Sequence, residues 1–271
     1  GSLILIWIMT KTSESSLLVF GLIFSAFPVV LLLWFNLFAF NKRYSNYKPS
    51  LKYWKKEYLK DIFGLGISFF IIQISGIVLY STDNFIVSTL FSPTEVVPFN
   101  IAFKYMSMAL MIFSIIAAPY WSSITDAYNR HDIPWIKNVM KNFQRISLLF
   151  IALISLMIFI SNYAYHIWIG NKINIPLDLT VLMGIFFAAS SYVTPFTMFL
   201  NGTGKVKLQA IQSIISAFIN IPLSIYFAKE IALGSTGVIL ATIICFLPSI
   251  ILPRIQFNEL ITQTAEGIWN E

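Results

Sequence analysis

Residues 62–91 read IFGLGISFFIIQISGIVLYSTDNFIVSTLF, and this stretch decides the fold class. A helix needs about 20 predominantly apolar residues to cross the hydrocarbon core of a bilayer, and the stretch is longer than that. One charged residue, Asp83, lies well inside it. A charge near the centre of a bilayer costs roughly 2.5–3.5 kcal/mol on insertion scales, so such a residue indicates a functional position with a partner.

The composition of the whole chain agrees with a membrane protein. Of its 271 residues, 57% are hydrophobic and 11% are charged, and the mean hydropathy is +0.76. Soluble domains average about 25% charged residues. We therefore predict an all-α fold, a polytopic bundle of transmembrane helices. The expected spans are 17–40, 62–91, 99–124, 146–169, 177–200, 210–228 and 236–255, and residues 1–9 are interpreted as the end of an earlier helix in a chain that lacks its N-terminal part.

The basic residues alternate between the two sides of these spans. Most of the 18 Lys and Arg residues lie in 41–60, 125–145, 201–209 and the C-terminal tail. Only Lys11, Lys172 and Lys229 lie in the other connections. Cytoplasmic loops carry an excess of Lys and Arg, so the C-terminus is predicted to be cytoplasmic. Topology thus accounts for the net charge of +6, and no nucleic-acid partner is expected.

The longest connection, 41–60, is the predicted seam between two helical bundles. Leu51, Trp54 and Tyr58 recur at helical spacing with lysines between them. This pattern favours a basic amphipathic helix lying on the inner leaflet. A solvated linker is the alternative.

Four spans carry polar side chains three or four residues apart, which places each set on one helix face. Together they predict a water-filled cavity. The alternative is packing, because Ser, Thr and Asn also form hydrogen bonds between membrane helices. The four sets are Gln73, Gly76, Tyr80 and Asp83 or Asn84; Asn100, Lys104, Ser107 and Ser114; Ser190, Thr194, Thr197 and Asn201; and Gln212, Ser216, Asn220 and Ser224.

Asp83 and Lys104 are predicted to lie at similar depths on two successive antiparallel helices. Their distances from the connecting turn differ by about 5 Å at 1.5 Å per residue. We therefore expect the two side chains to pair or to face one cavity. The alternative for Lys104 is that its long side chain reaches to the outer headgroups.

Motifs for catalysis or metal binding are missing from the sequence. Cys245 is the single cysteine, and His131 and His166 are far apart and match no zinc-binding spacing. The segment 201–205, NGTGK, lacks the spacing of a phosphate-binding loop and is predicted to be a turn. We expect no enzyme activity, no cofactor and no metal site.

Several motifs resemble those of a known transporter family. STDNFIVSTLFSPTEVVPFNIAFKYMSM (81–108) is similar to a segment typical of polysaccharide-biosynthesis transporters, although Pro98-Phe99 stands where that family often has Gly-Tyr. FLNGTGKVKLQAIQSIISAFINIPLS (199–224) resembles its loop and following helix, and GSTGVILAT (234–242) its start of the last span. The resemblance covers roughly residues 59–253 and is to the O-antigen flippase and polysaccharide exporter family, in the superfamily that also holds the multidrug and toxin extruders.

That resemblance implies a fold of two pseudo-symmetric lobes around a central cavity. In this chain, 1–40 would end the first lobe, 41–60 would be the basic cytoplasmic linker, 61–257 the second six-helix lobe and 258–271 a cytoplasmic tail. The implied function is alternating-access export of an undecaprenyl-diphosphate-linked oligosaccharide across the bacterial inner membrane. Implied partners are membrane lipids, a glycan polymerase or glycosyltransferases, and H⁺ or Na⁺ as coupling ion.

The substrate that the resemblance implies suggests roles for individual residues found on the polar helix faces and in the loops. The expected cationic partner of the diphosphate is Lys104, with Asp83 either positioning it or carrying a coupling proton or cation. Two other functions stay open, a cation-coupled multidrug extruder and a non-transporting scaffold of glycan assembly. The expected substrate-binding residues are Lys104, Asp83, Asn100, Gln73, Asn220 and Gln212, and those expected at the cytoplasmic mouth are Arg130, Lys205 and Lys207.

Overall fold

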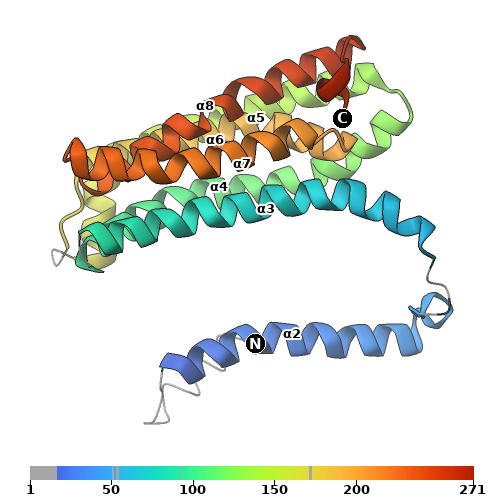
Figure 1. Ribbon diagram of the computed structural model, residues 1–271, viewed down its shortest axis with the longest axis horizontal. Helices are drawn as coiled ribbons and strands as arrows, with labels where there is room; N and C mark the ends of the chain where they lie inside the picture. The colour runs from blue at the N-terminus through green and yellow to red at the C-terminus, as the bar shows by residue number, and fades with distance from the viewer. Residues whose placement is uncertain (1–16, 51, 53–54, 92, 171–172) are drawn as a thin grey trace. The chain divides into compact units, whose positions relative to one another are not determined.

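A computed structural model describes residues 17–50, 52, 55–91, 93–170 and 173–271 (Figure 1). The described residues form α-helices, with short 3₁₀ and π-helical segments and no strand. The chain divides into two compact units, Gly1–Leu59 and Lys60–Glu271. The predicted partial helix at residues 1–9 lies outside the described residues.

In the first unit, α2 (Leu17–Lys42) is a single apolar helix followed by the 3₁₀ turn η1 (Ser45–Tyr47). Large apolar side chains between residues 29 and 38 are exposed, as expected for a helix surrounded by lipid. Residues 51, 53 and 54 of the predicted surface helix at 50–60 lie outside the described residues, and its last four residues already belong to α3, which begins at Glu57.

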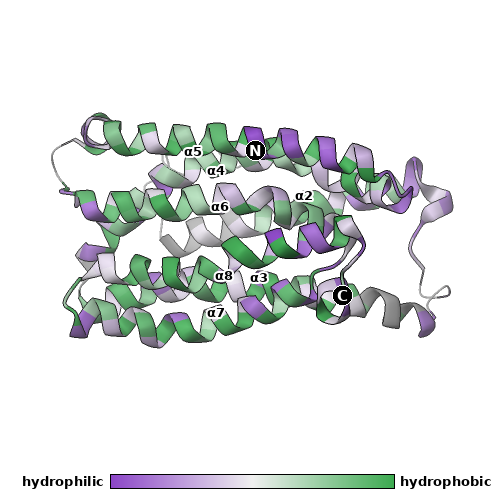
Figure 2. Cartoon of the chain, turned by 90° about the horizontal axis from the view of Figure 1, so that it is seen from above, coloured by the Kyte–Doolittle hydropathy of each residue, from purple (hydrophilic) through white to green (hydrophobic). Residues whose placement is uncertain are grey.

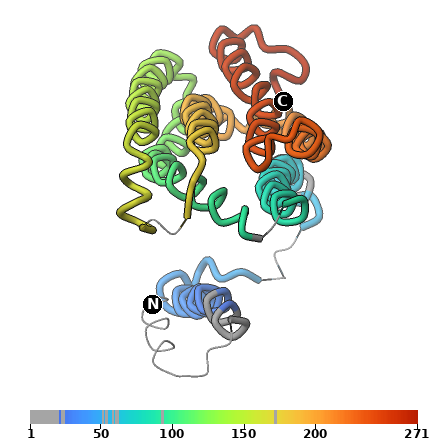
Figure 3. The backbone as a smooth tube through the Cα atoms, turned by 90° about the vertical axis from the view of Figure 1, so that its left-hand side faces the viewer, coloured from blue at the N-terminus to red at the C-terminus, as the bar shows by residue number. Residues whose placement is uncertain are grey.

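The second unit is a bundle in which α6 packs against α4, α5 and α8, and α7 packs against α8. Viewed end-on, α4, α5 and α6 group on one side and α3, α7 and α8 on the other (Figure 3). The helices are α3 (Glu57–Leu90), α4 (Pro93–Asn129), α5 (Ile133–Ile169), α6 (Leu177–Thr203), α7 (Lys207–Ile225) and α8 (Ser235–Thr262).

Seven described helices, α2 to α8, are long and apolar enough to span a membrane, which confirms the predicted all-helical class and the seven spans. The predicted spans of α4 and α5 were too short at their basic ends. Helices α4 and α5 each have 37 residues, or about 55 Å, so most of the expected loop 125–145 is helical. Figure 2 shows hydrophilic residues gathering toward the helix ends.

The chain reverses direction between α4 and α5 within a few residues. His131 adopts a left-handed conformation with φ of 59°, and the Asp132 side chain accepts a hydrogen bond from the Trp135 amide at 3.1 Å. That bond satisfies one of the free amides at the start of α5, and a proline in the first turn suits the same position. Capping by Asp132 therefore sets the start of α5, which lies well before the hydrophobic part of that helix. Hydropathy does not report capping.

At the basic end of α6, the chain closes a tight turn onto α7. Gly204 has φ of 74° and accepts the left-handed conformation that a side chain would disfavour. Buried Gln256 of α8 donates hydrogen bonds from Nε2 to the Lys205 carbonyl at 3.2 Å and to the Trp269 carbonyl at 2.9 Å. One glutamine thus fastens both this turn and the C-terminal 3₁₀ turn η4 (Gly267–Asn270) to α8.

At the opposite end, α7 passes into the π-helical segment η3 (Tyr226–Glu230) before α8 begins. A Cβ atom placed on Gly237 would lie 2.7 Å from the carbonyl carbon of Phe227. The first turn of α8 therefore packs directly against the backbone of η3, which explains the glycine in the GSTGVILAT motif.

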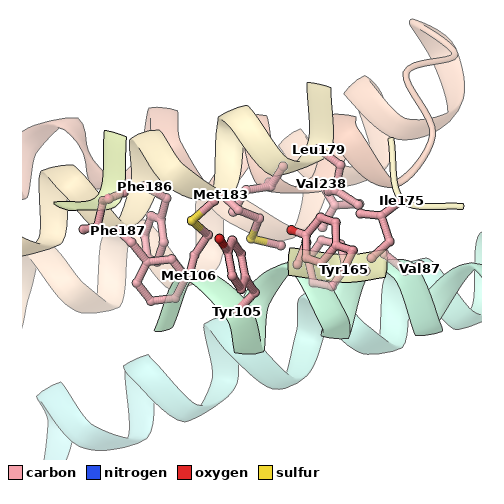
Figure 4. Close-up of a cluster of buried hydrophobic side chains, with 14 of the residues drawn as sticks. Val87, Tyr105, Met106, Tyr165, Ile175, Leu179, Met183, Phe186, Phe187 and Val238 are labelled. Atoms are coloured by element: carbon pink, nitrogen blue, oxygen red, sulfur yellow. The ribbon is translucent and has the colours of Figure 1, made fainter. Parts of the chain in front are cut away.

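The apolar core consists of two clusters. One, shown in Figure 4, includes Tyr105, Tyr165, Met183, Phe186 and Val238. The Tyr105 hydroxyl donates to the Met157 carbonyl at 3.0 Å, and the Tyr165 hydroxyl bonds Thr180 at 3.2 Å, so both buried phenols are satisfied. The second cluster, around Phe113, Phe143 and Phe199, lies toward the basic end.

Candidate functional site

Asp83 is buried, with 3% of its surface exposed, and its carboxylate faces α8. Its Oδ2 atom accepts a hydrogen bond of 2.9 Å from the Thr242 hydroxyl. Its Oδ1 atom is buried and has no hydrogen-bond partner. Nearly all buried polar atoms in native proteins are paired, and an exception of this kind indicates a place where a ligand, an ion or a proton acts.

The same hydroxyl joins Asp83 to α7. Thr242 accepts a hydrogen bond of 2.9 Å from the Asn220 amide, and Asn220 is fully buried. The Asn220 side-chain oxygen in turn lies 3.5 Å from the Ser224 hydroxyl. We call Asp83, Thr242, Asn220 and Ser224 the buried network. It connects α3, α8 and α7 through side chains alone.

A cavity of about 180 Å³ adjoins the buried network between α3, α6, α7 and α8. Thr242 and Tyr80 belong both to its wall and to the surroundings of Asp83. The rest of the wall alternates apolar with hydroxyl and amide side chains. Its polar members, besides those two, are Ser75, Gln209, Gln212, Ser213, Ser216 and Ser249.

Several of these polar groups hold one another in place. Gln212 donates from Nε2 to the Ser249 hydroxyl at 2.6 Å, and Ser216 donates to the Cys245 carbonyl at 2.8 Å. The Gln209 Oε1 atom is buried without a partner. The wall therefore combines positioned groups with an unused acceptor, an arrangement suited to a ligand that donates hydrogen bonds, such as a hydroxylated or protonated molecule.

Lys104 does not pair with Asp83, which corrects one of the two arrangements expected from the sequence. The two ion pairs among the described residues are Asp126–Arg130 and Lys207–Glu271. The buried face of α4 includes Ala102, Tyr105 and Ala109, and Lys104 lies off that face and is exposed. Depth alone suggested the pair, but the rotation of each helix about its axis separates the two side chains.

Asn100 makes the contact between α3 and α4 that had been assigned to Lys104. Its Nδ2 atom donates to Asn84 Oδ1 at 2.7 Å and to the Val96 carbonyl at 3.0 Å. Asn84 lies on α3, nine residues before α4 begins at Pro93, and follows Asp83 directly. Adjacent residues on α3 thus face different partners, Asp83 toward α8 and Asn84 toward α4.

The other expected binding residues divide between the site and the surface. Asn220 and Gln212 belong to the buried network and the cavity wall, on the face of α7 that their spacing predicted. Gln73 is exposed and does not line that cavity. On α6, Ser190, Thr194 and Thr197 donate to carbonyls of their own helix and do not line that cavity, so these three hydroxyls show neither the expected cavity nor the interhelical bonds of the packing alternative.

The residues expected at a cytoplasmic mouth are engaged by neighbouring parts of the chain. Arg130 pairs with Asp126, one turn earlier on α4. Lys205 donates from Nζ to the Asn270 carbonyl at 2.7 Å, and Lys207 pairs with Glu271. Lys205 and Lys207 therefore help hold the C-terminal turn η4 against the end of the bundle.

Sequence reasoning missed the residues of α8. Thr242, Ser249 and Gln256 recur every seven residues, which places them on one face two turns apart. All three make hydrogen bonds to other elements. This repeat of one polar residue every seven positions was the available signal, and it was overlooked because none of the three residues carries a charge.

The fold defines the class of protein, a multi-pass helical membrane protein with a MATE-like fold. A solved structure described as "Crystal structure of MATE P26A mutant" matches with a TM-score of 0.68 at 18% identity, covering 87% of this chain and 54% of that one. At this identity the match establishes the fold alone.

A sequence comparison adds a named relative. Over 180 residues, the chain is 22% identical to the "Putative O-antigen transporter" of Salmonella typhimurium, a match that covers 66% of this chain and 41% of the relative. The chain thus spans less than half of that relative's length. No protein-family model matches the chain. The two comparisons are consistent with the exporter superfamily expected from the motifs.

Proposed function

We propose that this chain forms part of a flippase that moves an undecaprenyl-diphosphate-linked oligosaccharide across the bacterial inner membrane by alternating access. The observation that carries the proposal is the cavity beside Asp83, whose wall presents hydroxyl and amide groups inside an apolar bundle. Sugars are recognised through such groups because each sugar hydroxyl both donates and accepts hydrogen bonds. The similarity to a protein named as an O-antigen transporter supports the same substrate class.

Lys104 is the proposed contact of the diphosphate. It is an exposed cation within the span α4, and neither ion pair of the described residues includes it. A lysine inside a membrane span that has no carboxylate partner can bind the negatively charged diphosphate of a substrate. Membrane lipids surround the protein in this proposal, the C-terminus is cytoplasmic, and a glycan polymerase or glycosyltransferases act alongside it. The chain itself performs no bond-breaking chemistry.

A glycan-translocation assay in a strain that lacks its own flippase tests the proposal. The complete natural protein should restore glycan on the periplasmic face. Lys104→Ala should lower that restoration at least tenfold at equal expression, because a charge-assisted contact with a phosphate is lost. Lys229→Ala is the matched control, since it removes an exposed lysine of η3. Undiminished translocation by Lys104→Ala would remove Lys104 from the substrate path.

A second function, cation-coupled extrusion of drugs, is favoured by one specific observation. The buried Oδ1 atom of Asp83 lacks a partner, and this is the environment in which an acid can exchange a proton or hold a cation during transport. The MATE-like fold accommodates that function equally. Drug-resistance profiling of cells that express the complete protein separates the two proposals: broad resistance without glycan translocation would favour the extruder.

A further inference from the structure

A second cavity, of about 420 Å³, lies between α5, α6 and α8 at the basic end of the bundle. We call it the basic cavity. It is separate from the cavity beside Asp83 and shares no lining residue with it. Its wall consists of Lys137, Met140, Lys141, Gln144, Phe196, Arg254, Phe257, Asn258, Ile261 and Thr262.

Three cations gather in this wall, and no carboxylate lies among the lining residues. Lys137 and Lys141 are one turn apart on α5, so both extend from the same face. Neither ion pair of the described residues includes them or Arg254. Arg254 donates from Nη1 to the Tyr192 hydroxyl at 2.7 Å, which positions the guanidinium. Because these three cations have no carboxylate partner within the described part of the protein, they are available to bind an external anion.

The remaining wall is apolar and aromatic. Phe196 of α6 and Phe257 of α8 meet edge to face with their ring centres 5.7 Å apart, and Met140 and Ile261 extend the same surface. Cationic and apolar surfaces therefore adjoin in one cavity. A small hydrated anion would use only the cations, whereas an amphiphile with an anionic head would use both surfaces.

We propose that the basic cavity binds the phosphate of an anionic phospholipid, with the headgroup against Lys137, Lys141 and Arg254 and the start of an acyl chain against Phe196 and Phe257. Arginine matches phosphate with two parallel hydrogen bonds, and lysines supply further charge. Basic pockets between membrane helices near the cytoplasmic face are suited to such headgroups. The site lies on the side that the positive-inside rule assigns to the cytoplasm.

Native mass spectrometry of the complete natural protein tests this site with phosphatidylglycerol as the probe and phosphatidylcholine as the zwitterionic comparison. Each cation near a headgroup contributes about fivefold in affinity. The K141Q/R254Q variant should therefore bind phosphatidylglycerol at least tenfold more weakly. The K137R/K141R/R254K variant keeps all three charges and should bind normally.

The matched control is R43Q/K229Q, which removes one exposed arginine and one exposed lysine from positions outside the cavity wall. It should retain phosphatidylglycerol binding. Equal loss in this control, or equally tight binding of phosphatidylcholine, would overturn the proposal. So would displacement of the lipid by inorganic phosphate at the same concentration, because the ligand would then be the free anion. If K141Q/R254Q does not fold, K137Q alone changes one exposed residue and should weaken binding about fivefold.

Discussion

Replacing Thr242 by valine probes the buried network most sharply. The change keeps the branched shape and removes only the hydroxyl. Asp83 then loses its hydrogen bond of 2.9 Å, which leaves both carboxylate oxygens without a partner, and the Asn220 amide loses its acceptor. In water-soluble proteins, bonds to charged groups contribute about 1.5–3 kcal/mol each. Hydrogen bonds between membrane helices average about 0.6 kcal/mol and reach about 1.7, because the unfolded chain also finds partners in the membrane.

Two such bonds give an expected loss of about 1–3 kcal/mol in the free energy of unfolding for Thr242→Val. The assay is unfolding of the purified protein in mixed micelles by increasing denaturing detergent. Thr262→Val is the matched control on the same helix, since the Thr262 hydroxyl is exposed and bonds the carbonyls of its own turn. That control should change the free energy of unfolding by less than about 0.5 kcal/mol.

A double-mutant cycle then isolates the pair. Asp83→Ala, Thr242→Val and the combined variant should show a coupling of about 0.5–1.5 kcal/mol, because each single change removes one partner of the same hydrogen bond. A coupling of zero within error would refute the contact between Asp83 and Thr242, and with it the orientation of α3 toward α8.

Two further predictions concern the packing around the site. Gly237→Ala should lower the free energy of unfolding by about 1–3 kcal/mol, because the added methyl group would collide with the backbone of Phe227. Gly66→Ala is the control: its methyl group meets open space, so the change should be neutral or stabilising in the same detergent titration. Gln256→Leu removes the donor to Lys205 and Trp269 and should speed proteolytic removal of the C-terminal turn severalfold, as limited proteolysis would measure; an unchanged cleavage rate would contradict this role of the glutamine.

The helices of this bundle were predictable because hydropathy and length report membrane spans directly. The long extensions of α4 and α5 were not predictable, because the residues beyond the expected spans are polar and their hydropathy is low. The start of α5 is set instead by the hydrogen bond that caps the helix at Asp132. Hydropathy measures partition into lipid, and helix ends depend on backbone hydrogen bonds that it ignores.

The candidate site was predictable in part. Asp83 was identified because a buried charge is costly, and Asn220 and Gln212 because their spacing places them on one face of α7. The partner of Asp83 was not identifiable, since depth along two helices does not fix how each is rotated. Ala102, Tyr105, Met106 and Ala109 form the buried face of α4, which leaves Lys104 exposed. Thr242 fills the partner role from the far end of the sequence, where only the seven-residue polar repeat pointed to it.

Translocation by the purified complete protein in proteoliposomes tests the central claim most directly. The vesicles would carry a fluorescent undecaprenyl-diphosphate oligosaccharide, and its exposure on the opposite leaflet would be followed with an impermeant quencher. The account predicts translocation by the natural protein and at least tenfold slower translocation by a Gln212→Leu variant, which removes an amide from the cavity wall. Protein that folds and inserts normally but leaves the labelled lipid on its original leaflet would contradict the proposed function.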